Sequence, residues 1–399
     1  MTIFSGILIG YIFAGCVYWL WMAAGSLRIV RALPVLARVC PPNPPEWPKL
    51  SIVIPACNEG ETLAAAAASV LGQDYPDLEV VLIDDRSTDD TGRLVDEIAA
   101  ADYRVTPVHV GELPEQWLGK VHALYCGSRR ATGEWLLFMD ADVHLAPGVL
   151  RRAVAYCQYH GLDHLAVVPE VHPPSFAVRA AVAMFARIFT VMMRCWAIDD
   201  PQSGAFIGIG AFNLVRRAAL DETPGFAWLR LEVADDLGLG MMLKRQGARC
   251  CLAVGTGMIG LDWYRSLGEM ARGTEKAYAT VADCRIGRLL AVCLLLVALE
   301  SAPWVTLALV PLGIPGLLPP GLTMLAALGI CIAPGLHWQR HSVVPGLCTP
   351  LGLAVNVALL LRSGWLGVRR GGIDWRGSRY SARALHEGKR VRLLTRSPS

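Results

Sequence analysis

The sequence predicts an α/β domain with a mostly parallel sheet, flanked by transmembrane helices towards both ends of the chain. The 399 residues are 54% hydrophobic and 18% charged, whereas typical soluble domains carry about 25% charged residues. The apolar residues gather in two blocks, and the stretch between them alternates short β-branched runs with helical runs. The composition excludes a disordered chain, and a net charge of +3 gives no indication of a nucleic-acid partner.

The first apolar block lies within residues 1–26 and carries no charge. It is long enough to cross a bilayer, and positive charge follows it, whereas a signal peptide, the alternative interpretation, has its charge in front. We therefore expect an uncleaved transmembrane helix that ends in the cytoplasm, followed by a proline-rich linker over 27–48. The charges that set this orientation are Arg28, Arg31 and Arg38.

The second apolar block, 286–361, divides into three pieces near 289–311, 316–336 and 343–361. With the middle of the chain in the cytoplasm, three spans would put the arginine-rich tail, 362–399, on the outside, against the positive-inside trend. We expect that one piece is re-entrant or interfacial, unless the tail departs from this trend. Glu300, inside the first piece, marks either a functional intramembrane acid or a break in the helix or a re-entrant hairpin.

Residues 49–262 are expected to form the soluble domain. Its first half alternates strands and helices, which indicates a mostly parallel sheet, and ligands of such sheets bind beyond the carboxyl ends of the strands. The expected strands are 50–55, 78–83, 105–110 and 134–139, and the expected helices are 61–73, 88–101 and 118–131.

Two carboxylates, Asp140 and Asp142, follow a strongly apolar run that ends at Met139. Residues two apart can both face one ion if the backbone leaves the strand there. Oxygen ligands suit Mg²⁺ or Mn²⁺, and such an ion neutralises charge on a leaving nucleoside diphosphate. An acidic turn is the alternative, but the position after this strand favours a metal site.

Three further acids have two interpretations each. Asp85 ends the second expected strand, where it can accept hydrogen bonds from a base or ribose, while Thr88 or Asp89 caps the next helix. Asp235 and Asp236 open a later apolar-periodic helix. They either stabilise its N-terminus, or one of them is a general base that deprotonates an acceptor hydroxyl attacking a sugar carbon.

Four segments in this order resemble the motifs of the family 2 glycosyltransferases, which have the GT-A fold. The resemblance covers about residues 50–250 and implies that fold for this chain. The matching segments are Val53–Glu59, the opening strand and loop; Asp84–Thr91, the nucleotide-contacting turn; Phe138–Asp142, the D-x-D motif; and Asp235-Asp236, the acid–Asp pair whose second member is the base.

The resemblance implies a role for each matching residue. Asp140 and Asp142 would hold a divalent cation, Mg²⁺ or Mn²⁺, on the donor diphosphate. Asp236, with Asp235 beside it, would be the base of an inverting, single-displacement transfer. The residues expected to bind the nucleotide sugar are Pro55, Ala56, Asn58, Glu59, Asp85 and Asp140.

Two segments resemble a narrower group of membrane-bound members, associated with hopanoid, carotenoid and sphingolipid glycosylation. Trp117–Leu124 resembles their W-x-G-K-x-x-A-L element. Lys120 is then expected to reach a donor phosphate; an ordinary lysine at a helix start is the alternative. Trp375–Tyr380 resembles their W-[KR]-G-R-x-Y ending with one extra residue, and suggests no role by itself.

Two departures from the family pattern favour addition of a single sugar. Gly238 stands where the family often has a further acid after the acid–Asp pair. The Q-x-x-R-W element of processive members is missing, since Gln246–Cys250 lacks the tryptophan and lies too close to Asp236.

Two arginine-containing apolar segments are expected to lie in the membrane interface. Phe176–Trp196 holds three arginines, which disfavour a full span; a buried core helix is the alternative. Residues 263–285 mix aromatic and basic residues in the same way. Between these segments, the glycines of 204–210 are expected to let substrate approach the backbone, or to lie in a simple strand.

Together these features predict a multi-pass protein of the cell (inner) membrane with a cytoplasmic catalytic domain. Its expected activity is the transfer of one sugar from a UDP- or GDP-linked donor to a membrane lipid of the hopanoid, carotenoid, ceramide or diacylglycerol type. Transfer to a polyprenyl phosphate or a cell-envelope polysaccharide is the second possible glycosyltransferase activity. A nucleotidyltransferase would not need Asp236, and a non-catalytic membrane scaffold would not need to keep the acids, so the sequence favours both of these less.

Overall fold

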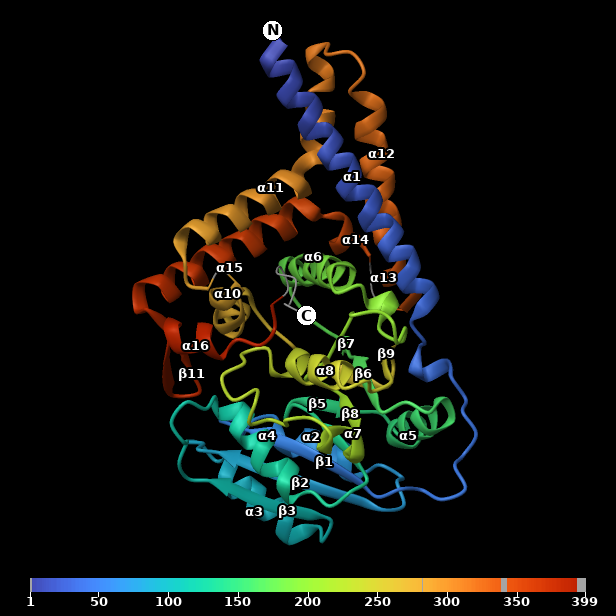
Figure 1. The fold of residues 1–399 in the computed structure, drawn as a ribbon, viewed down its shortest axis with the longest axis vertical. Helices are drawn as coiled ribbons and strands as arrows, with labels where there is room; N and C mark the ends of the chain where they lie inside the picture. The colour runs from blue at the N-terminus through green and yellow to red at the C-terminus, as the bar shows by residue number, and fades with distance from the viewer. Residues whose placement is uncertain (1, 282, 339–342, 393–399) are drawn as a thin grey trace. The chain divides into compact units, whose positions relative to one another are not determined.

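The computed structural model describes residues 2–281, 283–338 and 343–392 (Figure 1). The chain forms two compact units, each assembled from segments far apart in the sequence. The sheet unit comprises 33–172, 197–263 and 374–399, and the helical unit comprises 1–32, 173–196 and 264–373. The units therefore differ from the linear division expected above, because 173–196 joins the membrane helices and the end of the tail joins the sheet.

The main sheet of the sheet unit has the strand order β3-β2-β1-β4-β8-β6-β9 within the described residues. Every neighbouring pair is parallel except the two that involve β8, so the mostly parallel sheet is confirmed. The strands are β1 (Leu50–Ala56), β2 (Leu78–Asp85), β3 (Val105–Val110), β4 (Trp135–Phe138), β6 (His164–Val168), β8 (Asn213–Arg216) and β9 (Cys250–Val254).

The centre of this sheet is buried on both faces. All seven residues of β1 are buried, which explains its uninterrupted apolar sequence. A smaller sheet pairs β5 (Val143–Leu145), β10 (Ile259–Leu261) and β7 (Glu170–Val171). The helices of the unit are α2 (Leu63–Leu71), α3 (Thr91–Ala101), α4 (Gly119–Arg130), α5 (Val149–His160), α7 (Arg217–Asp221), α8 (Asp235–Arg245) and α16 (Ala382–Gly388).

The expected strands and helices between residues 50 and 139 are all present, with ends shifted by three residues or fewer. The N-terminal helix extends past the expected end at residue 26, and its last residue is Ala32. Beyond it the chain enters the sheet unit at once, where Val35 pairs with Val254 and Leu36 is buried in the core. Much of the expected proline-rich linker is therefore packed chain.

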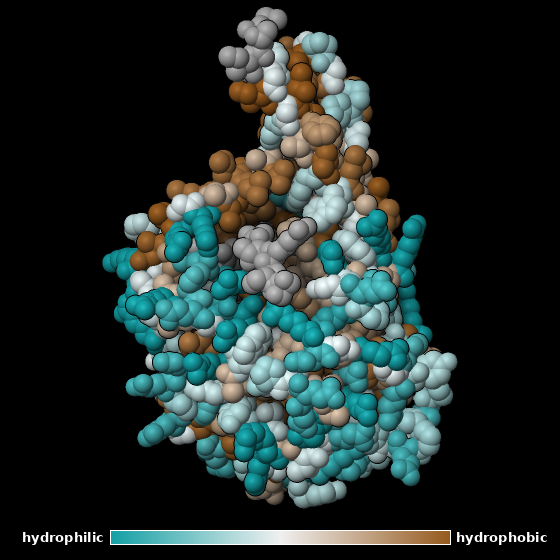
Figure 2. Space-filling model, in the orientation of Figure 1, coloured by the Kyte–Doolittle hydropathy of each residue, from teal (hydrophilic) through white to brown (hydrophobic). Residues whose placement is uncertain are grey.

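The helical unit is built from long apolar helices, and apolar side chains cover much of the surface that they present (Figure 2). Among the described residues, five stretches are long and apolar enough to cross a membrane: 5–32, 176–197, 286–308, 318–338 and 349–370. The helices are α1 (Thr2–Ala32), α6 (Phe176–Met192), α9 (Leu267–Gly273), α10 (Glu275–Val281), α11 (Ile286–Ala308), α12 (Leu318–Cys331), α13 (Ala333–Trp338), α14 (Val344–Leu347) and α15 (Thr349–Arg370).

Small residues bring the long helices of this unit close together. A Cβ on Gly15 would lie 2.8 Å from Ala302 Cβ, so α1 packs directly on α11. A Cβ on Gly352 would lie 2.7 Å from the Ala180 carbonyl, so α15 packs on α6 in the same way. Close contact at small residues is typical of helices that associate inside a membrane.

The intramembrane acid Glu300 is fully buried and paired. Arg187 of α6 donates to its Oε2 at 2.5 Å, and Tyr18 of α1 donates to its Oε1. The Arg187 guanidinium also lies 4.9 Å from the ring centre of Trp19. A helix break and a re-entrant hairpin at Glu300 are both wrong, because α11 continues through it to Ala308. Glu300 neutralises the charge of Arg187, one of the arginines expected to disfavour a full span.

Candidate active site

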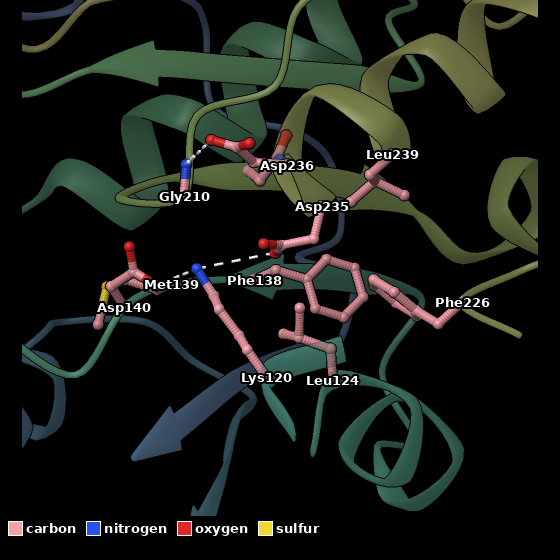
Figure 3. A pocket seen from close by; sticks show the side chains of 11 residues that line it. Lys120, Leu124, Phe138, Met139, Asp140, Gly210, Phe226, Asp235, Asp236 and Leu239 are labelled. Atoms are coloured by element: carbon pink, nitrogen blue, oxygen red, sulfur yellow. Dashed lines mark hydrogen bonds and ion pairs between the residues drawn. The ribbon is translucent and has the colours of Figure 1, made fainter. Parts of the chain in front are cut away.

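The carboxyl ends of β1 and β4 form the centre of the candidate site. β1 and β4 are neighbours in the sheet, with β2 on one side of them and β8 and β6 on the other, and ligands of such sheets bind where the strand order reverses in this way. A pocket at this edge is lined by Lys120, Leu124, Phe138, Met139, Asp140, Gly210, Asn213, Phe226, Asp235, Asp236 and Leu239 (Figure 3). The structure thus brings together the D-x-D aspartate, the acid–Asp pair and the W-x-G-K lysine, which are far apart in the sequence.

Lys120 is the central cation of the pocket. It comes from the first turn of α4, and its side chain is 12% exposed. Its Nζ lies 2.6 Å from Asp140 Oδ1 and 3.7 Å from Asp235 Oδ2. Burial opposes the charged form, but the charges of Asp140, Asp235 and Asp236 outweigh it and raise the pKa of Lys120. Lys120 is therefore not an ordinary lysine at a helix start, because it is a permanent positive charge among three carboxylates.

Asp235 and Asp236 occupy the first turn of α8 and point in different directions (Figure 3). Asp235 faces Lys120. Asp236 accepts hydrogen bonds from the amides of Gly210, at 3.0 Å, and Leu237, at 2.8 Å. Burial is the main cause that raises the pKa of Asp236 to about 6, followed by the neighbouring Asp235, while Lys120 lowers it. A carboxylate with this pKa is mostly ionised at neutral pH and still able to accept a proton.

The glycines of 204–210 hold α8 in place. A Cβ on Gly208 would overlap the Asp236 carbonyl, and a Cβ on Gly240 would overlap the Ile207 carbonyl, so this loop crosses the first turns of α8 backbone to backbone. Gly210 adds the amide that orients Asp236, and its carbonyl accepts the Asp140 amide at 3.0 Å. The segment, all of it within the described residues, holds no strand, contrary to the alternative interpretation, and its close backbone contact is with α8; the approach of a substrate to these glycines stays a prediction.

Asp142 and Glu59 add negative charge next to Asp140. Burial raises the pKa of Asp142 to about 7, and the charges of Asp140 and Glu59 contribute in the same direction. Burial also raises the pKa of Glu59. Carboxylates this close together repel one another when they are ionised. A bound divalent cation removes that repulsion and favours the ionised form of each carboxylate, so such a group suits a hard cation. The donor set formed by Asp140 and Asp142 therefore fits Mg²⁺ or Mn²⁺ with further ligands from a diphosphate and water.

The loop after β1 is tied to the loop after β2. Asn58 has a positive φ of 57°, which asparagine tolerates better than most residues, and its Oδ1 accepts the Thr88 amide at 2.8 Å. Asp89 Oδ1 accepts the Thr91 amide at 3.0 Å, but the N-cap of α3 is Asp90, so the expected cap at Thr88 or Asp89 is wrong. Pro55, the expected nucleotide residue within β1, is buried.

Asp85 is fully buried and already paired. Its Oδ1 accepts from Arg86 Nε at 2.9 Å and its Oδ2 accepts from Arg376 Nη1 at 3.1 Å. Sequence reasoning missed these two arginines as partners of Asp85. The tail motif Trp375–Tyr380 was the available signal, but nothing in the sequence placed it beside the second strand, 291 positions away.

Comparison with known proteins agrees with this geometry. The pattern of the family described as "Glycosyl transferase family 2" matches residues 51–238. These residues match a family 2 glycosyltransferase domain over a little under half of the chain. The match contains all four motifs, and it ends within α8, just after the acid–Asp pair.

Relatives of the glycosyltransferase domain act on lipid-related substrates by name. The 4,4'-diaponeurosporenoate glycosyltransferase of Staphylococcus haemolyticus is 26% identical over 239 residues, which are 59% of this chain and 62% of the relative. The undecaprenyl-phosphate 4-deoxy-4-formamido-L-arabinose transferase of Klebsiella pneumoniae is 31% identical over 150 residues, 36% of this chain and 44% of the relative. In both cases the match spans less than two thirds of the relative's length.

A solved structure supports the GT-A fold over most of the chain. The mannosyltransferase PcManGT of Pyrobaculum calidifontis, in complex with GDP-Man and Mn²⁺, matches with a TM-score of 0.52 and 20% identity. The similarity covers 91% of this chain and 97% of that one. It confirms the predicted GT-A fold.

Proposed function

We propose that the protein is an inverting glycosyltransferase that moves a single sugar from a nucleoside-diphosphate donor to a membrane lipid. The observation that carries the proposal is the position of Asp236. Its carboxylate is oriented by two backbone amides in the pocket that also holds Lys120 and Asp140. A base, a cation and the D-x-D aspartate thus converge on one small volume.

In the proposed reaction, Asp236 accepts the proton of the acceptor hydroxyl as its oxygen attacks the anomeric carbon of the sugar. The bond from that carbon to the diphosphate breaks, and the configuration inverts because attack and departure occur on opposite faces. Lys120 stabilises the negative charge that develops on the leaving diphosphate. A divalent cation on Asp140 and Asp142 would supply further charge neutralisation. Asp235 holds Lys120 in position.

The donor and acceptor classes are supported by the relatives and by the helical unit. A similar structure binds GDP-Man and Mn²⁺, and the named relatives transfer sugars to a carotenoid acid and to undecaprenyl phosphate. The helical unit also holds an apolar cavity of about 280 Å³ lined by residues of α11 and α15, which is enough room for part of a hydrocarbon chain. A polyprenyl phosphate is the second candidate acceptor, because of the relative at 31% identity.

We also propose a membrane topology in which α1, α11 and α12 cross and the sheet unit is cytoplasmic. The chain on both sides of the 173–196 segment belongs to the sheet unit. A single crossing of the membrane by α6 would therefore put parts of that unit on opposite faces of the membrane, which is impossible for a compact unit. By the same reasoning, 264–373 must cross an even number of times. Three arginines lie in or next to α6, and three lie in the C-terminal half of α15, which suits interfacial helices. The arginines after α1 favour the cytoplasmic side.

A transfer assay tests the proposed function. The detergent-purified protein is incubated with Mn²⁺ or Mg²⁺, radiolabelled UDP- and GDP-sugars and lipids extracted from the source organism. Wild type should move label into the organic phase, whereas Asp236→Asn and Asp142→Asn should not. Asp221→Asn, which changes an exposed carboxylate at the end of α7, is the matched control and should transfer normally.

The chemistry of the labelled lipid separates the two acceptors. A sugar on a lipid hydroxyl survives mild acid, whereas a sugar phosphodiester of a polyprenol is released by it. If no donor yields labelled lipid or free nucleoside diphosphate, the catalytic proposal is wrong and a scaffold role remains.

A further inference from the structure

The C-terminal tail returns to the sheet unit as a tight hairpin. Strands β11 (Gly372–Trp375) and β12 (Ser378–Ser381) pair with each other, and a two-residue turn joins them. Both turn residues have positive φ, 48° at Arg376 and 73° at Gly377, as a type I′ turn requires. This turn places Arg376 at the tip of the hairpin.

Arg376 is held on the buried carboxylate that ends β2. Asp85 is 0% exposed and accepts from Arg376 and from Arg86, one guanidinium on each oxygen. Arg86 also has a positive φ, 58°, and its Nη1 donates to Ser378 of the hairpin at 3.1 Å. Because one carboxylate holds two guanidinium groups, the cluster keeps a net charge of +1. Arg86 Nη2 has no hydrogen-bond partner among the described residues, so the cluster has an unused donor.

The W-x-G-K glycine fits against this cluster. A Cβ on Gly119 would lie 2.6 Å from Asp85 Oδ2 and would overlap Arg86 Nη2. Lys120, which binds Asp140 in the active-site pocket, is the next residue. Gly119 therefore allows the cluster to pack against the first turn of α4, directly beside the residue that reaches the D-x-D aspartate.

A second contact anchors the tail near the acid–Asp pair. The buried Glu232 accepts the backbone amides of Arg390 and Val391, at 2.6 and 2.8 Å. Arg390 Nε also donates to the Trp228 carbonyl at 3.1 Å. The tail is thus fastened on both sides of the site, at the end of β2 and just before α8.

The position of Arg376 is that of a donor-binding residue. Asp85 ends β2, next to β1, and the parallel register pairs Ala56 with Asp84. Arg376 lies close enough to the loop after β1 for its charge to lower the pKa of both Cys57 and Glu59 against the effect of their burial. Ligands of this kind of sheet bind at these strand ends.

We propose that the C-terminal hairpin is a wall of the donor site, where Arg376 and Arg86, held on Asp85, bind the nucleoside part of the donor. The inference rests on the proposed function and deepens it. Asp85 is fully buried behind the two arginines that it binds, so the cluster offers donors rather than an acceptor. It therefore suits a base with carbonyl oxygens on its edge, as uracil and guanine have. Asp85 is then a positioning residue that acts through the arginines.

Nucleotide binding tests this directly. The dissociation constants of UDP, GDP and inorganic pyrophosphate are measured with Mg²⁺ by titration calorimetry on the full chain in detergent. Arg376→Ala should weaken the nucleotide that wild type prefers by roughly 10- to 100-fold, the range expected for a lost charged hydrogen bond. Pyrophosphate binding should change less than twofold. Arg376→Lys keeps the positive charge but loses the planar set of guanidinium donors, so its nucleotide affinity should lie between those of the wild type and Arg376→Ala.

Arg383→Ala is the matched control, because Arg383 lies in the same tail, is 88% exposed and pairs only at the surface with Glu387. It should bind nucleotide like wild type, and thermal unfolding must show that each variant is folded. Ser378→Ala, a milder change, should weaken nucleotide binding in the same direction. Equal nucleotide affinity in folded Arg376→Ala, or an equal loss for pyrophosphate, overturns the inference while leaving the proposed function intact. A wild type that binds no nucleotide refutes both.

Discussion

Replacing Gly208 by alanine should abolish most activity without touching a polar side chain. The new Cβ would lie well within 3.0 Å of the Asp236 carbonyl, a separation that real Cβ atoms essentially never show. The obstacle is backbone on both sides, so no side chain can swing away. The loop and the first turn of α8 must therefore separate by about 1 Å, and a misplacement of that size can lower kcat about 100-fold.

The control for this variant lies four residues earlier in the same loop. A Cβ on Gly204 meets nothing within 4 Å, so Gly204→Ala should keep nearly wild-type activity. The assay is initial transfer of labelled sugar at saturating donor, together with the thermal unfolding midpoint. Donor affinity should change little, because the loss falls on the base. If folded Gly208→Ala keeps more than half of the wild-type kcat, the inferred role of this backbone contact is refuted.

Three further predictions concern titrating and paired groups. Asp236→Asn should lower kcat about 10²- to 10⁴-fold. Because the pKa of Asp236 is raised to about 6, the kcat/KM of the wild type should decrease as the pH is lowered through about 6. A kcat/KM that stays constant down to pH 5 contradicts the role of Asp236 as base. Burial lowers the pKa of His164 to about 4, so as the pH falls the imidazole is protonated in the unfolded chain before it is protonated in the folded chain. The free energy of unfolding should therefore be highest above about pH 6.5 and fall by up to roughly 3 kcal/mol towards pH 4. His164→Gln should remove this pH dependence in a series of thermal unfolding experiments. Removing only Glu300 or only Arg187 should destabilise the helical unit by about 3–5 kcal/mol, and changing both to leucine should cost less; a double variant as unstable as the sum of the singles contradicts the pair.

The predictability of the fold follows from local signals. The expected strands and helices from 50 to 139 are present because β-branched runs and helical runs alternate there at regular spacing. The D-x-D pair, the acid–Asp pair and Lys120 were found from motif order, and the structure places Lys120, Asp140, Asp235 and Asp236 around one pocket.

The partners of these residues could not be found in the same way. Asp85 was expected to face the nucleotide with free oxygens, but it holds Arg86 and a second arginine from the far end of the chain. The glycines of 204–210 suggested a close approach of substrate or a simple strand, whereas Gly208 allows a backbone crossing over α8. Neither contact can be predicted from a local or periodic sequence pattern, because each joins segments that are far apart along the chain.

The sequence by itself determined the fold class, the family motifs and the presence of membrane helices, since local apolar patterns and strand ends encode these features. Only the tertiary structure decided that α6 packs in one unit with α1, α11, α12 and α15, and that the end of the tail belongs to the sheet unit. It also decided that Glu300 and Arg187 neutralise each other. The physical reason is the same in each case: a buried charge needs a partner, and folding can supply that partner from any distance along the chain.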